Sequence, residues 1–170
     1  MKSKKNLILI GMMGSGKTTI GSLISKKLKV KFIDTDSVLE DVTKMKIVEI
    51  FEKKGEKFFR NLEEEITLKL LNSTNNVISL GGGGFINEKI RKEVLKNNFS
   101  FWLNCDTQSL LNRIKKNQRR PISFNLSDSE LTELITKRTK IYSKAQFKIN
   151  CHKLKKTEIV KKILKIYERN

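Results

Sequence analysis

The sequence predicts an α/β protein in three layers, with a five-stranded parallel sheet and helices on both of its faces. Short apolar runs recur along the chain, and segments with apolar residues at helical spacing separate them. In addition, a glycine-rich turn follows the first apolar run directly and leads into a helical segment. Strands that alternate with helices are typical of a parallel sheet. We expect one domain over residues 1–170.

The expected elements follow from these patterns in chain order. Strands are predicted at residues 7–10, 30–33, 76–80, 99–104 and 147–150. Helices are predicted at residues 18–28, 37–43, 47–54, 57–71, 87–96, 107–116, 127–145 and 157–167. Ser127 begins the long helix, because Glu130 stands three residues later as in a capping box. Ligands of such sheets bind at the carboxyl ends of the strands.

The composition favours a globular protein over a membrane or secreted one. The 170 residues are 38% hydrophobic, which is enough for one substantial core. No apolar run approaches the ~20 residues of a membrane span, and the run at 7–10 is too short for a signal peptide. We therefore expect a cytoplasmic protein with no membrane partner. Cys105 and Cys151 are distant in the sequence, and we expect free, half-buried thiols rather than a disulfide.

The formal net charge of +18 raises the alternative of a nucleic-acid-binding ATPase. However, the excess charge is mostly lysine and is spread over the whole length. The sequence also has no aromatic RNA-binding motif, no set of zinc ligands and no dense basic arm. We therefore expect no nucleic-acid partner.

Residues 11–18 match the phosphate-binding motif G-x-x-x-x-G-K-S/T in full. Its glycines let successive N–H groups point at phosphate oxygens, and the helix N-terminus adds partial positive charge. Lys17 would reach the β- and γ-phosphates, and the Thr18 hydroxyl would ligate Mg²⁺. No N-K-x-D guanine motif is present, so we expect ATP as cofactor. The predicted nucleotide contacts in this segment are Gly14, Ser15, Gly16, Lys17, Thr18 and Thr19.

Two carboxylates, Asp34 and Asp36, follow the second predicted strand. In an extended chain, side chains at i and i+2 face the same way, so both would look toward the phosphate-binding loop. One could hold the Mg²⁺ water shell, and the other could accept a proton from an attacking hydroxyl. The alternative is that one of them caps the helix predicted at residues 37–43.

Seven arginines stand among many lysines, and arginine is the better residue for a bidentate grip on carboxylate or phosphate. Arg60 has Glu63 and Glu64 at helical spacing, so a local salt bridge is its alternative role. Residues 117–125 lack periodicity, and we expect them to form a mobile lid that carries Arg119 and Arg120. As a set, the arginines indicate an anionic acceptor. Four glycines, residues 81–84, would allow a ligand to approach the backbone closely.

With these features, the chain resembles the shikimate kinase family. The resemblance rests on motifs in family order: the phosphate-binding loop, D-T-D at 34–36, F-R-N-L-E at 59–63, the glycines at 81–83, R-P at 120–121 and R-x-x-x-Y at 138–142. It implies a P-loop kinase fold like that of the nucleoside monophosphate kinases. It also implies transfer of the ATP γ-phosphate to the 3-hydroxyl of shikimate, a small-molecule partner, by a monomer in aromatic amino-acid biosynthesis.

The resemblance also implies residue roles. Asp36 would bind the shikimate hydroxyls and act as base, and Asp34 would lie near Mg²⁺. Arg60 and Arg138 would grip the shikimate carboxylate, with Glu63 orienting Arg60. The remaining implied contacts are with substrate at Gly81, Gly82 and Gly83, with the phosphates at Arg120, and with adenine at Arg113. Lys17, Asp36 and Arg120 would be the catalytic residues.

The sequence departs from the family pattern at two places. Gly84 stands where alanine or serine is more usual. Residues 150–156 lack the adenine-side arginine and proline of the family, and His152 there is expected to be an exposed loop residue. The rival within the same fold is a kinase for another hydroxy acid, such as gluconate.

Overall fold

The computed structural model describes residues 5–116 and 126–170 of the chain. Its described strands form one sheet in the order β2-β3-β1-β4-β5, and every neighbouring pair is parallel. The strands are β1 (Leu7–Ile10), β2 (Lys31–Asp34), β3 (Asn76–Ser79), β4 (Phe99–Asn104) and β5 (Phe147–Asn150). The predicted sheet is therefore confirmed, with the first strand of the chain at its centre.

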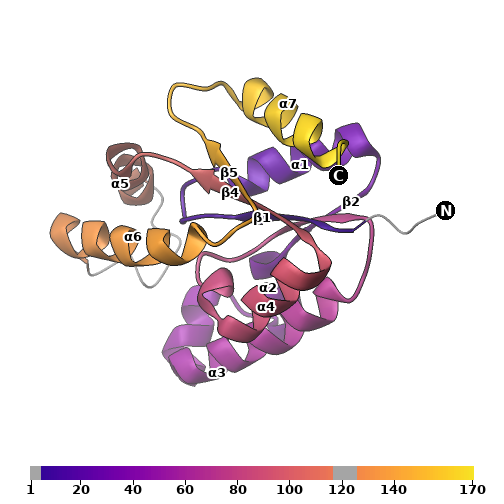
Figure 1. Ribbon diagram of the computed structural model, residues 1–170. Helices are drawn as coiled ribbons and strands as arrows, with labels where there is room; N and C mark the ends of the chain where they lie inside the picture. Colours follow the sequence, from indigo (N-terminus) through magenta and orange to yellow (C-terminus); the bar gives the residue numbers. More distant parts are fainter. Residues whose placement is uncertain (1–4, 117–125) are drawn as a thin grey trace.

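Helices cover both faces of the sheet, as Figure 1 shows. On one face lie α1 (Lys17–Leu28) and α7 (Lys156–Tyr167), and on the other lie α2 (Thr35–Thr43), α3 (Ile47–Leu71) and α4 (Glu88–Asn97). At the carboxyl end of the strands lie α5 (Thr107–Lys116) and α6 (Asp128–Tyr142). The short 3₁₀ helix η1 (Gly84–Ile86) follows β3 and contacts α4 and α6.

The central strand supplies both cores because side chains alternate between the faces of a strand. Leu7 and Leu9 pack into the core under α1 and α7, whereas Ile8 and Ile10 pack into the core on the other face. All four side chains are at most 1% exposed. A fully apolar strand is what a parallel sheet covered on both sides requires.

Three expectations differ from the structure by more than one residue. The helices expected at 47–54 and 57–71 are joined into α3, which is broken at Gly55 by a φ of 81° and a ψ of 166°. The helix expected to reach residue 145 ends at Tyr142, although Ser127 and Glu130 form the predicted capping box at its start. The extended chain expected through residue 36 is also wrong, because β2 ends at Asp34 and α2 begins at Thr35.

Two observations complete the fold. Among residues 5–116 and 126–170, no helix is long and apolar enough to cross a membrane. Cys105 and Cys151 are free thiols of intermediate exposure, as predicted.

Candidate active site

The loop between β1 and α1, residues 11–16, has the geometry of a phosphate-binding turn. Gly14 and Gly16 have φ values of 78° and 92°, in the region where a side chain would be strained. Gly16 is the N-cap of α1, and no side chain caps this helix. The N–H groups of its first turn can therefore serve an anion.

The side chain of Lys17 lies across this loop. Lys17 is 6% exposed, and its ammonium donates to the carbonyls of Gly11 at 2.8 Å and Met12 at 3.0 Å. Lys17 also lines an open cleft of about 510 Å³ that reaches Thr18, Asp34 and other residues of the carboxyl edge. A phosphate group entering the cleft would therefore meet the ammonium beside the loop.

Asp34 caps a helix, which is the alternative role that the sequence offered, and it also bonds Thr18 at the start of α1. It is the N-cap of α2, where its Oδ1 accepts the N–H of Asp36 at 3.1 Å. Its Oδ2 accepts the Thr18 hydroxyl at 2.8 Å. Asp36 lies in the first turn of α2, so a helical turn rather than an extended chain brings the two carboxylates to the cleft.

The Thr18 hydroxyl and the Asp34 carboxylate fit a magnesium ion. Both are oxygen donors, and they lie side by side at the cleft. Mg²⁺ is usually held by one or two protein oxygens together with water and substrate phosphates. In the part of the chain that the structure describes, no group of three or more His, Cys, Asp or Glu residues could hold a metal ion.

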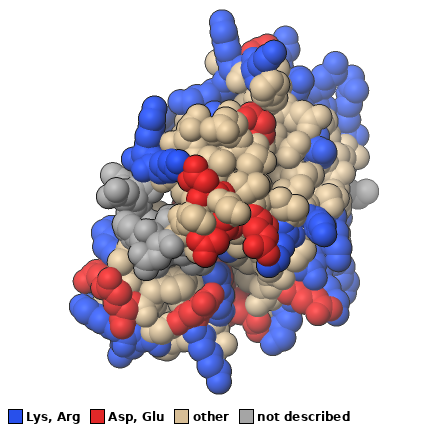
Figure 2. Space-filling view, turned by 90° about the vertical axis from the view of Figure 1, so that its left-hand side faces the viewer, with Lys and Arg blue, Asp and Glu red and all other residues tan. Residues whose placement is uncertain are grey.

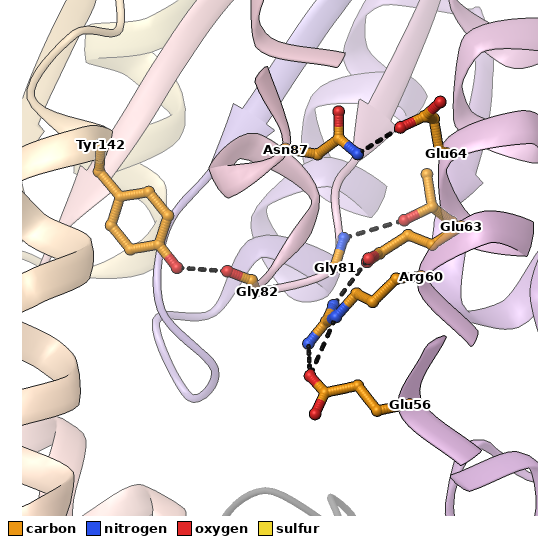
Figure 3. A network of polar contacts seen from close by, with 9 residues as sticks. Glu56, Arg60, Glu63, Glu64, Gly81, Gly82, Asn87 and Tyr142 are labelled. Carbon is orange, nitrogen blue, oxygen red and sulfur yellow. Dashed lines mark hydrogen bonds and ion pairs between the residues drawn. The ribbon is translucent and has the colours of Figure 1, made fainter. Parts of the chain in front are cut away.

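Arg60 is fixed by acids on its own helix, α3. Its Nη1 donates to Glu63 Oε2 at 2.7 Å, and two further nitrogens lie 3.4 Å from Glu56 Oε1 (Figure 3). Glu63 is 3% exposed, whereas the Arg60 side chain is 30% exposed. The local salt bridge expected as the alternative role of Arg60 is therefore present, and the Arg60 guanidinium also lines a pocket.

Arg138 approaches the same pocket from α6. It is 8% exposed, and its Nη1 lies 3.8 Å from the Met12 sulfur in the phosphate-binding loop. One helical turn later, the Tyr142 hydroxyl donates to the carbonyl of Gly82 (Figure 3). Arg138 is thus a buried residue of the site and not a surface helix residue.

The glycines after β3 allow three polar side chains to crowd over the turn. A Cβ at Gly81 would lie 2.5 Å from Asp36 Oδ1 and 3.1 Å from Glu63 Oε1. A Cβ at Gly83 would collide with the Arg60 guanidinium. Glycine at these positions therefore leaves room for Asp36, Glu63 and Arg60 to lie as they do. The Gly81 N–H is fixed by the buried Thr35 hydroxyl at 2.9 Å, a contact that sequence reasoning missed.

Figure 2 looks onto the end of the molecule that carries α5 and α6 in Figure 1. Acidic side chains gather near the middle of this face, and lysine and arginine side chains surround them. Asp34, Asp36 and Glu40 line a pocket of about 280 Å³ together with Arg113. The chain as a whole is strongly basic, yet carboxylates gather at the site and basic side chains surround them.

The remaining predicted residues lie around this cleft or outside the described chain. Arg113 donates to the Gly14 carbonyl at 3.1 Å, so it lies against the phosphate-binding loop. His152 is exposed, as predicted, and its Nδ1 lies 3.2 Å from the Asp106 carboxylate. Arg119 and Arg120, with the lid expected at 117–125, lie outside the described residues.

Comparisons with known proteins agree with this geometry. The sequence model of a family described as shikimate kinase matches residues 13–168. The chain belongs to the shikimate kinase family. A shikimate kinase from Thermodesulfovibrio yellowstonii is 39% identical over 166 residues, which cover 97% of this chain and 96% of that protein.

Solved structures show the same relation. A shikimate kinase from Acinetobacter baumannii, solved in complex with shikimate, superposes with a TM-score of 0.92 at 28% identity and covers 98% of this chain and 94% of that one. A gluconokinase from Sinorhizobium meliloti reaches a TM-score of 0.62 at 14% identity, with 99% and 94% covered. At that identity the likeness shows the fold alone, so the P-loop kinase fold extends beyond the shikimate kinase family.

Proposed function

We propose that the chain transfers the γ-phosphate of ATP to the 3-hydroxyl of shikimate, giving shikimate 3-phosphate for aromatic amino-acid biosynthesis. The observation that carries the proposal is one pocket beside the phosphate-binding loop, lined by Asp36 and by two arginines from different helices, Arg60 and Arg138. Glu63 also lines this pocket and is paired with Arg60. Two arginines and the Asp36 carboxylate are suited to a ligand with a carboxylate and hydroxyl groups.

On the donor side, the N–H groups of the loop and the first turn of α1 bind the phosphates. Lys17 exchanges its bonds to the Gly11 and Met12 carbonyls for the β- and γ-phosphate oxygens. Charge that develops on the transferring group is then stabilised by an ammonium already in place, which is how such sites lower the barrier. Arg113 adds a positive charge beside Gly14, and Arg120 is proposed to add another.

On the acceptor side, the pair Arg60 and Arg138 would hold the carboxylate and fix the ring. Asp36, over Gly81, would bind the reacting hydroxyl and accept its proton as the bond to phosphorus forms. Glu63 would keep Arg60 oriented while the substrate is absent, since a free guanidinium on a flexible side chain would lose that geometry. The backbone at Gly82 would contact the substrate, positioned by Tyr142.

The proposal includes Mg²⁺ as the second cofactor, held by Thr18 and Asp34. When bound, the ion would neutralise charge on the phosphate oxygens. The proposal also includes a monomeric, cytoplasmic enzyme without a nucleic-acid or membrane partner, and a single domain with a lid near residues 117–125.

A coupled assay of ADP release tests the function. The purified chain is offered shikimate, gluconate or nucleoside monophosphates with ATP and Mg²⁺, and single-stranded DNA or RNA in parallel reactions. Turnover should depend on shikimate and give shikimate 3-phosphate, identified by mass spectrometry. Release of ADP that depends on gluconate, a nucleotide or nucleic acid instead would refute the proposal.

A further inference from the structure

Two cysteines that are 46 positions apart in the sequence directly follow two neighbouring strands of the sheet. The register of β4 and β5 pairs Leu103 with Ile149 and Asn104 with Asn150. Cys105 directly follows β4, and Cys151 directly follows β5. The Cys151 N–H donates to the Asn104 carbonyl at 2.9 Å. Neighbouring strands are about 4.8 Å apart. That spacing lies within the ~4.4–6.8 Å between Cα atoms that a disulfide spans.

The two thiols lie close enough to interact, and Cys105 lies beside the phosphate-binding loop. The Cys151 thiol donates to the Ile149 carbonyl at 3.3 Å. The Cys105 thiol also approaches the Ser15 carbonyl, at 3.7 Å. Both cysteines are only half-buried, so a small reagent can reach them.

Their surroundings make the two thiols unequal. The hydrogen bond from Cys151, aided by the positive charges of Arg113 and Lys17, lowers the pKa of the Cys105 thiol to about 7. The same hydrogen bond, together with burial, raises the pKa of Cys151 above its ordinary value. Cys105 is therefore the thiolate of the pair, and the thiolate is the reactive form of cysteine.

We propose that Cys105 and Cys151 are a peroxide-reactive thiol pair that closes to a disulfide next to the phosphate-binding loop. In the first step, the Cys105 sulfur attacks hydrogen peroxide. An S–O bond forms, the O–O bond breaks, and hydroxide leaves and takes up a proton, which gives a sulfenic acid and water. In the second step, the Cys151 sulfur attacks the Cys105 sulfur. The S–O bond breaks, and hydroxide leaves with the Cys151 proton as water. The thiols lose two electrons, and peroxide is reduced to two waters.

The disulfide acts on nucleotide binding through Ser15. In its protonated form the Cys105 thiol donates to the Ser15 carbonyl, and the disulfide has no proton to donate, so the loop loses one of its supports. One net hydrogen bond corresponds to about a 2- to 10-fold change in an equilibrium. We expect the KM for ATP to rise by that factor on oxidation, while the KM for shikimate stays within about 2-fold. Reduction with dithiothreitol restores both.

The full-length chain is treated with hydrogen peroxide, blocked with N-ethylmaleimide and examined by intact mass and non-reducing peptide mapping. We expect a loss of two hydrogens per chain and a peptide that links Cys105 to Cys151. Oxidised Cys105 in a chain whose Cys151 still reacts with N-ethylmaleimide, a disulfide between two chains, or no reaction would each overturn the proposal. The mass measurement does not depend on turnover, so a failure of the disulfide proposal can be distinguished from a failure of the proposed function.

Two variants assign the roles within the pair. Cys151→Ser should accumulate a sulfenic acid at Cys105 that dimedone traps. This variant cannot form the disulfide, so peroxide should not cause the rise in the KM for ATP that dithiothreitol reverses. Cys105→Ser should leave Cys151 unoxidised at the same peroxide dose. Faster oxidation of Cys151 in Cys105→Ser than of Cys105 in Cys151→Ser would reverse the assignment and overturn it.

Discussion

Substitution of Gly83 by alanine should weaken shikimate binding without unfolding the protein. The new Cβ would collide with Arg60 Nη1 and lie 3.0 Å from Cζ and 3.2 Å from Nη2, so the whole guanidinium must move. The backbone of Gly83, with φ −93° and ψ −16°, suits alanine, and the obstacle is the end of a flexible side chain. The fold should therefore lose less than about 1 kcal/mol of stability.

The functional cost follows from the bond that the displaced guanidinium gives up. Arg60 Nη1 donates to Glu63 at 2.7 Å, and a hydrogen bond between charged groups contributes about 1.5–3 kcal/mol. We therefore expect kcat/KM for shikimate to fall about 10- to 150-fold, with the KM for ATP little changed. Steady-state kinetics and thermal unfolding measure the two effects.

A neighbouring glycine supplies the matched control. A Cβ at Gly84 would come no closer than 3.5 Å to Leu80, which is an ordinary contact, so Gly84→Ala should keep near-normal activity. If Gly83→Ala acts through Arg60, it should cost little more in an Arg60→Ala background. Equal losses in both glycine variants, or full additivity with Arg60→Ala, would refute the reasoning.

Three further predictions concern side chains of the site. Lys17→Ala should lower kcat by about 10³-fold or more; near-normal turnover would contradict the phosphate-binding role. Arg138→Lys keeps the charge but loses the planar fork, so shikimate use should fall by about 1.5–3 kcal/mol with the KM for ATP unchanged; unchanged shikimate kinetics would place the carboxylate elsewhere. Glu63→Gln keeps the shape but loses the charge that holds Arg60, so it should raise the KM for shikimate about 10-fold. Its melting temperature should change by only a few degrees, and an unfolded Gln variant would instead show a structural role.

The sheet could be predicted well because its strands are apolar on both faces. β1, β4 and β5 begin and end where the apolar runs do, whereas β2 is shifted by one residue at both ends and β3 ends one residue early. Hydrophobic burial decides these segments, and it is visible in the residue types themselves. The phosphate-binding loop was found for a similar reason, since its glycines and Lys17 have fixed spacing.

Features that depend on long-range neighbours could not be predicted. The two cysteines were expected to be unrelated, and only the pairing of β4 with β5 brings them together. No structural role was predicted for Lys17, whereas its ammonium donates hydrogen bonds to two loop carbonyls, so Lys17→Ala should also cost some stability. Asp36 was misplaced in an extended segment, because Asp34 both ends the strand and caps the helix that begins at Thr35.

The central position of β1 has a consequence for how the chain folds during synthesis. Leu7 pairs with Val77 on one side and with Phe99 on the other. β1 therefore cannot pair with β3 or with β4 until the ribosome has made that later strand. Such distant pairings are slow, and they leave an apolar segment without its partners in the growing chain. The strand that precedes the phosphate-binding loop is thus translated first but paired late. We therefore expect nascent chains to aggregate or bind chaperones most readily before residue 104, the end of β4, has left the ribosome.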